Sequence, residues 1–294
     1  MLLAPGVHGE LVRPSGPPLA AVLVLAGSSG RVDVHRARLL AQHGAISLAL
    51  QWFGGAGQPP GICEVPLATF ALGLDLLCHN ASGLPLGIIG TSKGAEAALL
   101  VATVDHRVDA VVALAPTHVA WANVGPGLDG QTYPYRSSWS MQGVPLPFVT
   151  YDETWEPQGV GPVAYRVSYE RSLALDDGRA AAARIQVERT QADLLLVAGG
   201  DDRMWPSLPF ANAVLAARRA AGLPAQVIGS AGAGHRVTFP GERPLPASPR
   251  YQYGGTVATD AELGRRAWPQ VLESLSLRPR RDSGTTGARD TSTY

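Results

Sequence analysis

The sequence predicts a doubly wound α/β domain, in which helices cover both faces of a mostly parallel β-sheet. Short apolar runs alternate with segments of helical periodicity along most of the 294 residues. The first long run, at residues 19–26, is apolar at nearly every position, as expected for a strand that is buried on both faces. The composition agrees, because 46% of the residues are hydrophobic and only 16% are charged, which is typical of a well-packed globular protein.

The expected elements follow one another in a regular order. An alternating segment at 7–13 ends in a Pro- and Gly-rich turn at 14–18 and leads into the first buried strand. Further strands are expected at 45–51, 86–90, 108–115, 193–198 and 225–228. Helices are expected in the segment that ends near residue 42 and at about 66–79, 95–102, 207–221 and 260–276. Because strand–helix–strand connections within a sheet are right-handed and place the strands parallel, this alternation indicates one doubly wound sheet.

One stretch, residues 117–180, departs from this alternation. It lies between the strands expected near 115 and 193 and is too long for an ordinary connection. Its many aromatic residues are Trp121, Tyr133, Tyr135, Trp139, Phe148, Tyr151, Trp155, Tyr165 and Tyr169. We interpret it as a cap-like insertion that contributes to a substrate cavity; the alternative is a surface excursion that packs on its own aromatic residues. The catalytic domain is then expected to span 1–278, and the polar tail 279–294 to be disordered.

The charge balance argues against large polyanionic partners. With 24 acidic and 24 basic residues the formal net charge is zero, so there is no basic field for nucleic acid or an anionic membrane. No run approaches the ~20 apolar residues of a membrane span, and the N-terminus lacks the features of a signal peptide. The two cysteines, Cys63 and Cys78, fit no metal-ligand spacing and are expected to be free thiols, with a disulfide as the alternative. We therefore expect a soluble cytoplasmic protein whose partner is a small-molecule substrate.

Residues 90–94 read Gly-Thr-Ser-Lys-Gly and match the motif G-x-S-x-G. In hydrolases this motif places a nucleophilic serine on a sharp turn between a strand and a helix, and the flanking glycines relieve the crowding there. The motif is short enough to occur by chance. Here, however, the apolar strand at 86–90 precedes it directly, and a run of helix-forming residues follows. Ser92 is therefore the candidate nucleophile, and a tight structural turn is the alternative.

A serine hydroxyl needs a base, and the base needs an acid that orients it. In hydrolases with this motif the residues follow in the order Ser, acid, His. His235 is the candidate base, because it lies in a Gly-rich loop directly after the last short strand. The acid should follow the preceding strand, where Asp201 and Asp202 stand side by side. We favour Asp202, since Pro206 lies four residues later, a spacing common after this acid, and keep Asp201 as the alternative.

The oxyanion of an acyl-transfer intermediate needs two fixed N–H donors. The backbone of Lys93 is one candidate, and Ser28, in the loop after the first long strand, is the other unless this loop is a plain turn. The Lys93 side chain could meet an acidic group of the substrate or pair with a nearby carboxylate. Candidate substrate contacts are Trp52, which could equally belong to the core, and the residues His118 and Trp205. The chain has no phosphate-binding loop, zinc-protease motif or dinucleotide fingerprint, so no metal or organic cofactor is expected.

Several stretches share a pattern with one known family. They are Ala-Gly-Ser-Ser-Gly at 26–30, Gly-Ile-Ile-Gly-Thr-Ser-Lys-Gly-Ala-Glu at 87–96, Gly-Asp-Asp with Trp205 at 200–205, Gly-Ala-Gly-His at 232–235, and Tyr-Gly-Gly-Thr at 253–256. With these motifs the sequence resembles the C-terminal catalytic domain of acyl-CoA thioesterases and bile acid-CoA:amino acid N-acyltransferases, close to dienelactone hydrolases. The resemblance covers about residues 18–277.

The resemblance implies an α/β-hydrolase fold, a Ser92–Asp202–His235 triad and an acyl-enzyme that is hydrolysed. Eukaryotic members carry an N-terminal β-sandwich domain, which we do not expect here. Acyltransferase members use cysteine as the nucleophile, whereas this chain has Ser92, which favours water as the acceptor. We therefore expect a hydrolase of acyl thioesters of the acyl-CoA type. The alternatives are a carboxylesterase like the dienelactone hydrolases, an acyltransferase to an amine, and a binding module without catalysis.

Overall fold

The computed structural model describes residues 1–175 and 178–277. Within these residues, a central sheet of eight strands has the order β1-β2-β4-β3-β6-β7-β10-β11. The strands are β1 Leu2–Ala4, β2 Val7–Val12, β3 Ala20–Leu25, β4 Ala45–Gln51, β6 Leu86–Thr91, β7 Ala110–Leu114, β10 Asp193–Gly199 and β11 Gln226–Ser230. Neighbours from β4 to β11 are parallel, while β2 pairs antiparallel with both β1 and β4.

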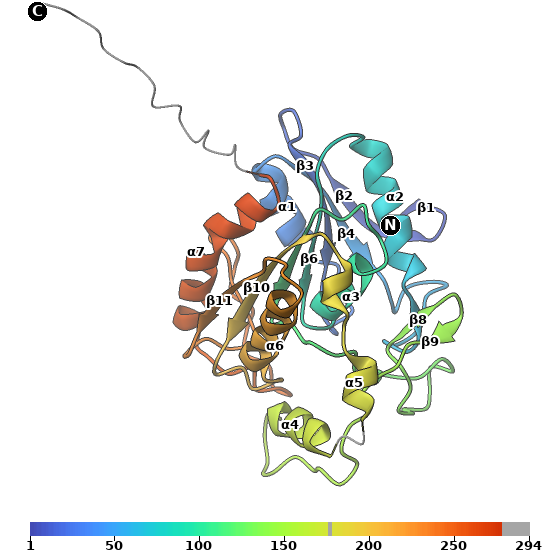
Figure 1. Cartoon of the computed structure of the whole chain (residues 1–294), viewed down its shortest axis with the longest axis vertical. Helices are drawn as coiled ribbons and strands as arrows, with labels where there is room; N and C mark the ends of the chain where they lie inside the picture. Colours follow the sequence, from blue (N-terminus) through green and yellow to red (C-terminus); the bar gives the residue numbers. More distant parts are fainter. Residues whose placement is uncertain (176–177, 278–294) are drawn as a thin grey trace, which may run out of the picture.

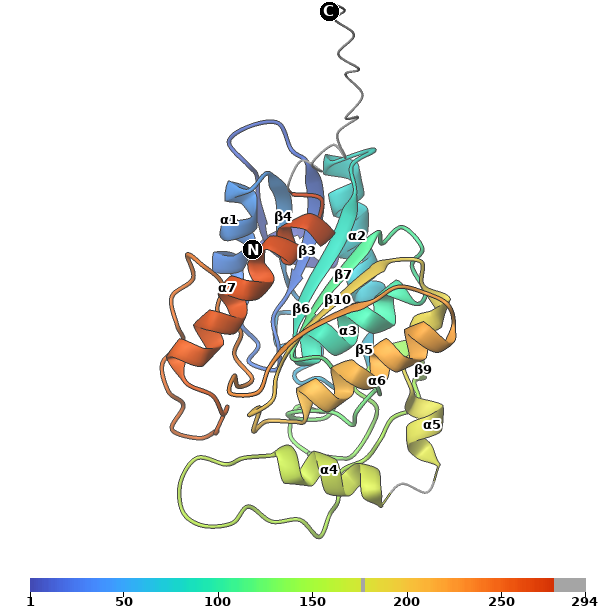
Figure 2. The same ribbon diagram turned by 60° about the vertical axis from the view of Figure 1, so that its left-hand side comes forward.

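Helices cover both faces of this sheet, as Figures 1 and 2 show. The helices are α1 Val34–Gln42, α2 Ala68–Asn80, α3 Lys93–Ala102, α6 Ser207–Ala220 and α7 Val257–Ser274. Successive residues of a strand point to opposite faces, so Val22 and Val24 pack with α1 and α7, whereas Leu23 and Leu25 pack with α2 and α3. The apolar run of β3 is continuous because its side chains are buried on both faces of the sheet. The predicted doubly wound α/β class is confirmed.

The predicted elements agree with the structure except near their ends and at one edge. The antiparallel edge strand β1 was not expected, because three residues are too few for a recognisable pattern. Helix α3 begins at Lys93 instead of residue 95, since β6 runs into the helix through a single residue, Ser92.

Residues 117–180 lie between β7 and β10. They contain β8 Trp139–Met141, β9 Val144–Pro145, α4 Arg166–Ala174 and part of α5 Arg179–Ala183. Strand β8 pairs with the short β5 Val65–Pro66, and α4 and α5 lie beyond one end of the sheet in both ribbon views. Trp139 joins the main core, and Trp121 packs in a cluster with Trp205 and Phe210. The role of this insertion as a cap stays a prediction, and the tail 279–294 lies outside the described residues.

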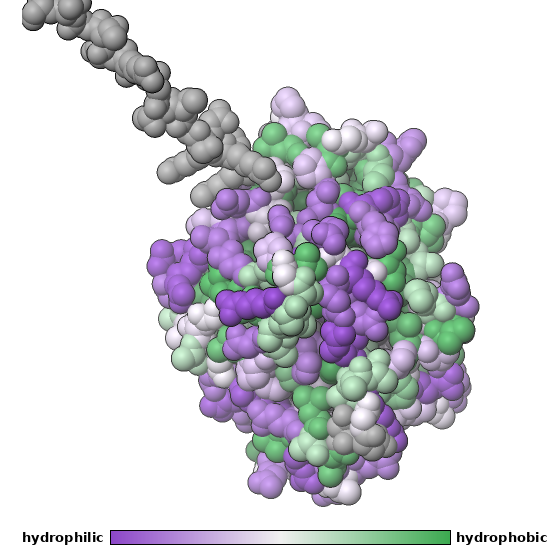
Figure 3. Space-filling model, in the orientation of Figure 1, coloured by the Kyte–Doolittle hydropathy of each residue, from purple (hydrophilic) through white to green (hydrophobic). Residues whose placement is uncertain are grey.

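The helices, the surface and the two cysteines were compared with the expectations from the sequence. In the described residues, no helix has the length and apolar character to cross a membrane. Hydrophilic and hydrophobic side chains are interspersed on the face shown in Figure 3. Cys63 is buried, Cys78 is partly buried, and both are free thiols.

Candidate active site

Ser92 forms the sharp turn between β6 and α3. Its backbone has φ 57° and ψ −121°, a conformation that a non-glycine residue adopts only where its surroundings enforce it. The Ser92 N–H donates to the carbonyl oxygen of Leu114 at the end of β7, over 2.8 Å. This is the strand–turn–helix geometry that the G-x-S-x-G motif predicts.

The two glycines of the motif allow this turn because a side chain would not fit at either position. A methyl group on Gly90 would lie 2.2 Å from the carbonyl oxygen of Gly94, and one on Gly94 would lie 2.4 Å from that of Ala26. Both distances are far below van der Waals contact. The close approach of strand, helix and the loop after β3 therefore requires glycine at residues 90 and 94.

His235 and Asp202 come from the loops that follow the adjacent parallel strands β11 and β10. The structure places His235 Nδ1 2.8 Å from Asp202 Oδ2. Asp202 is fully buried, and its Oδ1 accepts the N–H groups of Met204 at 2.9 Å and Trp205 at 3.2 Å. One carboxylate oxygen thus holds its own loop, while the other is free to orient the imidazole.

Asp201 has a different environment. Its side chain is exposed; Oδ2 accepts the Gly255 N–H over 2.8 Å, and Oδ1 pairs with Arg203. The Gly255 N–H, followed by Arg203, lowers the pKa of this carboxyl. Asp201 therefore fastens its loop to the segment before α7, and the geometry favours Asp202 as the partner of His235.

Asp260 on α7 supports the loop that carries His235, and sequence reasoning missed it. Its Oδ1 accepts the Gly234 N–H over 2.7 Å, and the His235 N–H donates to the carbonyl oxygen of Tyr253 over 2.8 Å. Burial raises the pKa of Asp260. No sequence motif indicates Asp260, because this residue contacts the His235 loop only when α7 packs on the sheet.

A buried arginine on α1 links the turn at Ser92 to the segment after His235. Arg36 Nη1 donates to Thr91 Oγ1 over 2.8 Å, and its Nε lies 2.7 Å from Glu242 Oε1. The other oxygen of Glu242 accepts the Phe239 N–H over 2.8 Å. The residue before Ser92 is therefore tied to the chain that follows the candidate base.

Trp205 and the insertion support the Asp202 loop. Trp205 is only 2% exposed, its indole N–H donates to the Ala115 carbonyl over 3.1 Å, and its ring centroid lies 5.8 Å from that of His235. It packs against the imidazole of His235, and its role as a substrate contact stays a prediction. Arg166 of α4 donates to the carbonyl oxygens of Gly200 at 2.9 Å and Asp202 at 3.2 Å.

The candidate oxyanion donors lie next to Ser92. Lys93 is the first residue of α3, so its N–H has no acceptor within the helix. The loop after β3 touches the turn, since a methyl group on Gly27 would lie 3.2 Å from Ser92 Cβ. Ser28 follows in this loop and is exposed. Both backbone donors thus belong to segments that meet at Ser92, and their role stays a prediction.

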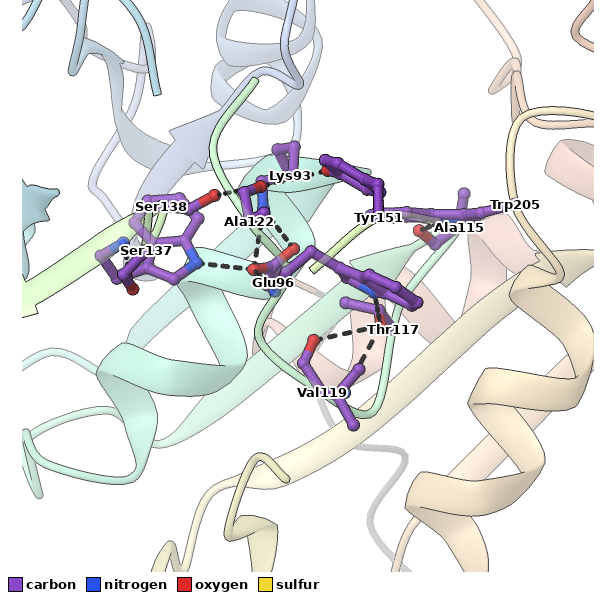
Figure 4. A network of polar contacts seen from close by, with 12 residues as sticks. Lys93, Glu96, Ala115, Thr117, Val119, Ala122, Ser137, Ser138, Tyr151 and Trp205 are labelled. Atoms are coloured by element: carbon purple, nitrogen blue, oxygen red, sulfur yellow. Dashed lines mark hydrogen bonds and ion pairs between the residues drawn. The ribbon is translucent and has the colours of Figure 1, made fainter. Parts of the chain in front are cut away.

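The Lys93 side chain is buried and paired with a carboxylate, which was one of the two alternatives. Its Nζ lies 2.8 Å and 2.7 Å from the two carboxylate oxygens of Glu96. Figure 4 shows this pair at the centre of a polar network that extends toward Thr117, Tyr151 and Trp205. The cationic group of Lys93 is therefore paired with Glu96 inside the protein.

Of the other two candidate contacts, Trp52 is buried and His118 is half-buried. Trp52 is 1% exposed and packs against the rings of Phe53, Phe70 and Trp139, so the structure places it in the core and not at the mouth of a site. His118 packs against Phe210 with ring centroids 4.8 Å apart, and its buried Nδ1 has no hydrogen-bond partner. Burial lowers the pKa of His118 to about 4.

The site thus contains one preformed pair, His235 and Asp202, and a candidate nucleophile, Ser92. Across residues 1–175 and 178–277, the hydrogen bonds join His235 to Asp202 but include none between the Ser92 hydroxyl and His235. Such bonds are often long before a substrate is bound. The same residues contain no group of three or more His, Cys, Asp or Glu side chains that could hold a metal ion.

A parallel sheet, a serine on a strand–turn–helix elbow and a later Asp–His pair define the class of α/β hydrolases. Solved structures share this fold. A candidate dienelactone hydrolase from Klebsiella pneumoniae subsp. pneumoniae superposes with a TM-score of 0.53 at 18% identity, covering 90% of each chain. An alpha/beta hydrolase fold protein from Nakamurella multipartita gives 0.50 at 16% identity, covering 92% of this chain and 96% of the other.

The chain belongs to the BAAT / Acyl-CoA thioester hydrolase C terminal family, whose model matches residues 76–277. It is 25% identical to the peroxisomal succinyl-coenzyme A thioesterase of Mus musculus, over 92% of this chain and 65% of the relative. It is 26% identical to the bile acid-CoA:amino acid N-acyltransferase of the same species, over 92% of this chain and 62% of the relative. This chain therefore spans less than two thirds of the length of either relative.

Proposed function

We propose that this chain is a serine hydrolase that cleaves acyl thioesters of the acyl-CoA type through Ser92, Asp202 and His235. One observation carries the proposal above the others. Ser92 has the strained backbone of a nucleophile elbow, in a domain whose later strand ends hold an imidazole 2.8 Å from a buried carboxylate. This arrangement supports nucleophilic catalysis, because the carboxylate can fix the imidazole with its other nitrogen available as a base.

In the proposed mechanism, Ser92 Oγ attacks the acyl carbon while His235 Nε2 takes the hydroxyl proton. Asp202 Oδ2 accepts the Nδ1–H hydrogen bond and stabilises the imidazolium. The N–H groups of Lys93 and Ser28 donate to the oxyanion. Collapse of the intermediate breaks the C–S bond, and the thiol leaves with the proton from His235. A water molecule, deprotonated by His235, then releases the acid from Ser92.

The substrate class rests on the family. The two relatives are a thioesterase and an N-acyltransferase by name, and both names contain a CoA ester. The zero net charge provides no general field for the phosphates of CoA, so we expect local arginines to bind them. The cytoplasmic location stays a prediction, since one relative is peroxisomal by name.

Labelling with a fluorophosphonate probe tests the nucleophile. We expect the probe to modify Ser92, and Ser92→Ala to lose both the label and turnover, by about 10³-fold or more. Circular dichroism of both proteins controls for folding. A folded wild-type protein that hydrolyses acyl-CoA but resists the probe, or a Ser92→Ala variant that retains its turnover, would contradict the proposal.

Transfer to an amine is the second candidate, because one relative is an N-acyltransferase by name. A serine acyl-enzyme is an oxygen ester, which is less open to amines than a cysteine thioester, so we expect free acid as the product. Product analysis with an amino acid such as glycine as the added acceptor separates the two activities. Amide formation that rises with acceptor concentration would favour transfer.

The leaving group can be tested on the same enzyme. We expect a higher kcat/KM for an acyl-CoA than for a p-nitrophenyl ester of the same acyl chain. The reverse order would favour a carboxylesterase and leave the catalytic triad unaffected.

A further inference from the structure

The proposed mechanism leaves unused the buried ion pair that follows the nucleophile. Lys93 is 1% exposed and Glu96 is fully buried, both on the first turn of α3. Burial lowers the pKa of Lys93, while the charge of Glu96 and its hydrogen bonds oppose this effect. Taking two charges out of water is costly, and their mutual attraction often fails to offset this cost. Stability alone therefore does not explain this buried pair.

The Glu96 carboxylate also holds the insertion. Its Oε1 accepts the backbone N–H of Trp121 over 2.9 Å and the indole N–H of Trp139 over 2.6 Å. Both tryptophans belong to residues 117–180 and are fully buried. Lys93 Nζ lies 5.2 Å from the centre of the Trp139 ring. One carboxylate on the nucleophile helix thus fixes two separate points of the insertion.

A chain of aromatic contacts continues from Trp121 to the candidate base. The Trp121 ring packs edge-to-face on Tyr169 with centroids 4.6 Å apart, and Tyr169 packs on Trp205 at 5.5 Å. Trp205 in turn lies 5.8 Å from the His235 ring and is held by its hydrogen bond to Ala115. Close-packed aromatic side chains leave little room for independent movement, so a shift of Trp121 would be passed on to His235.

We propose that Glu96 is a positioning residue, which fixes the insertion on α3 and, through Trp121, Tyr169 and Trp205, sets the orientation of His235. Lys93 balances the charge of Glu96. The inference rests on the proposed function, since it assigns His235 the role of the base. Its essential element is the hydrogen-bond acceptor at residue 96, and the negative charge is secondary.

Two double variants separate the acceptor from the charge. Lys93→Met with Glu96→Gln removes both charges but keeps an amide oxygen for the two N–H donors. Lys93→Met with Glu96→Ala is equally neutral but leaves both donors unpaired. We measure kcat and KM with acyl-CoA, and express kcat per Ser92 titrated by the fluorophosphonate, so that unfolded molecules do not count.

The Gln double variant is the reference for the Ala double variant, because both carry the same change at Lys93 and differ only in the acceptor at residue 96. Relative to the Gln double variant, the Ala double variant should lose about 10²-fold in kcat with little change in KM, since small misplacements of catalytic groups have effects of this size. Trp121→Phe provides a milder change in the aromatic chain, and we expect a smaller loss of kcat. If the Ala double variant does not fold, the kcat of Trp121→Phe tests the role of the aromatic chain.

Arg218→Met is the matched structural control. Arg218 is also buried, and it donates to the carbonyl oxygens of Val187, Thr190, Ala192 and Pro224. We expect a lower unfolding temperature but an unchanged kcat per titrated site. An unchanged kcat in the Ala double variant and in Trp121→Phe would overturn the inference. Failure of the proposed function has another signature, because the wild-type protein would then not be labelled at Ser92.

Discussion

At the scale of single residues, Asp201 and Asp202 show how adjacent carboxylates can have separate tasks. Asp202 Oδ2 faces His235, whereas Asp201 binds the Gly255 N–H. We expect Asp202→Asn to lose about 10⁴-fold in kcat, because an amide can donate to Nδ1 and thereby favour the wrong tautomer. Asp201→Asn retains an oxygen for Gly255 and should keep most of its turnover. Steady-state kinetics of the two variants test this, and a larger loss in Asp201→Asn would reverse the assignment.

His118 provides a prediction for stability against pH. Its pKa is about 4 in the folded protein, because burial disfavours the charged form, and about 6.5 in the unfolded chain. Between these values the unfolded state binds more protons than the folded state. The contribution of His118 to the free energy of unfolding is therefore fully present above about pH 6.5 and is lost as the pH falls toward 4. His118→Phe cannot take up this proton. Between pH 7 and 4.5 its free energy of unfolding should therefore fall by roughly 2–3 kcal/mol less than that of the wild type.

Urea unfolding at the two pH values measures this difference for His118. His106→Phe is the control, because His106 is exposed. Equal pH dependence of the wild type and His118→Phe would show that His118 becomes protonated in the folded protein as easily as in the unfolded chain.

At the scale of elements, the contact between β6, α3 and the loop after β3 depends on Gly94. We expect Gly94→Ala to destabilise the fold by about 3 kcal/mol or more, because the added methyl group would meet backbone carbonyl oxygens that cannot move independently. Gly16→Ala is the matched control, since nothing lies within 4 Å of the position a methyl group would take there. Denaturant unfolding compares them, and equal stability of the two variants would refute the role of this contact.

At the scale of the whole molecule, the insertion has no core of its own among the described residues. Its Trp121 shares a cluster with Trp205 and Phe210, and its Trp139 lies in the main core. We therefore expect the insertion and the sheet to unfold together. Tryptophan fluorescence and far-ultraviolet circular dichroism should give coincident transitions in urea, which is the test of a cooperative change. An earlier fluorescence transition would indicate an insertion that opens by itself.

The elbow at Ser92 and the position of the candidate base could be predicted because their signals are local. A strand that is buried on both faces must be apolar at consecutive positions, and the elbow motif consists of five adjacent residues, 90–94. His235 follows from its place after the last strand. The choice between Asp202 and Asp201 needed the structure, because the two share the same local sequence and differ only in which distant group each carboxylate meets.

The sequence by itself determined the α/β class, the order of strands and helices along the chain and the Ser92 elbow, since each depends on neighbours in the sequence. Only the tertiary structure decided that Trp52 belongs to the core, that Asp260 holds the His235 loop, and that Glu96 binds two tryptophans of the insertion. The physical reason is distance along the chain. These contacts join residues that no local pattern relates, and they form only when the helices pack on the sheet.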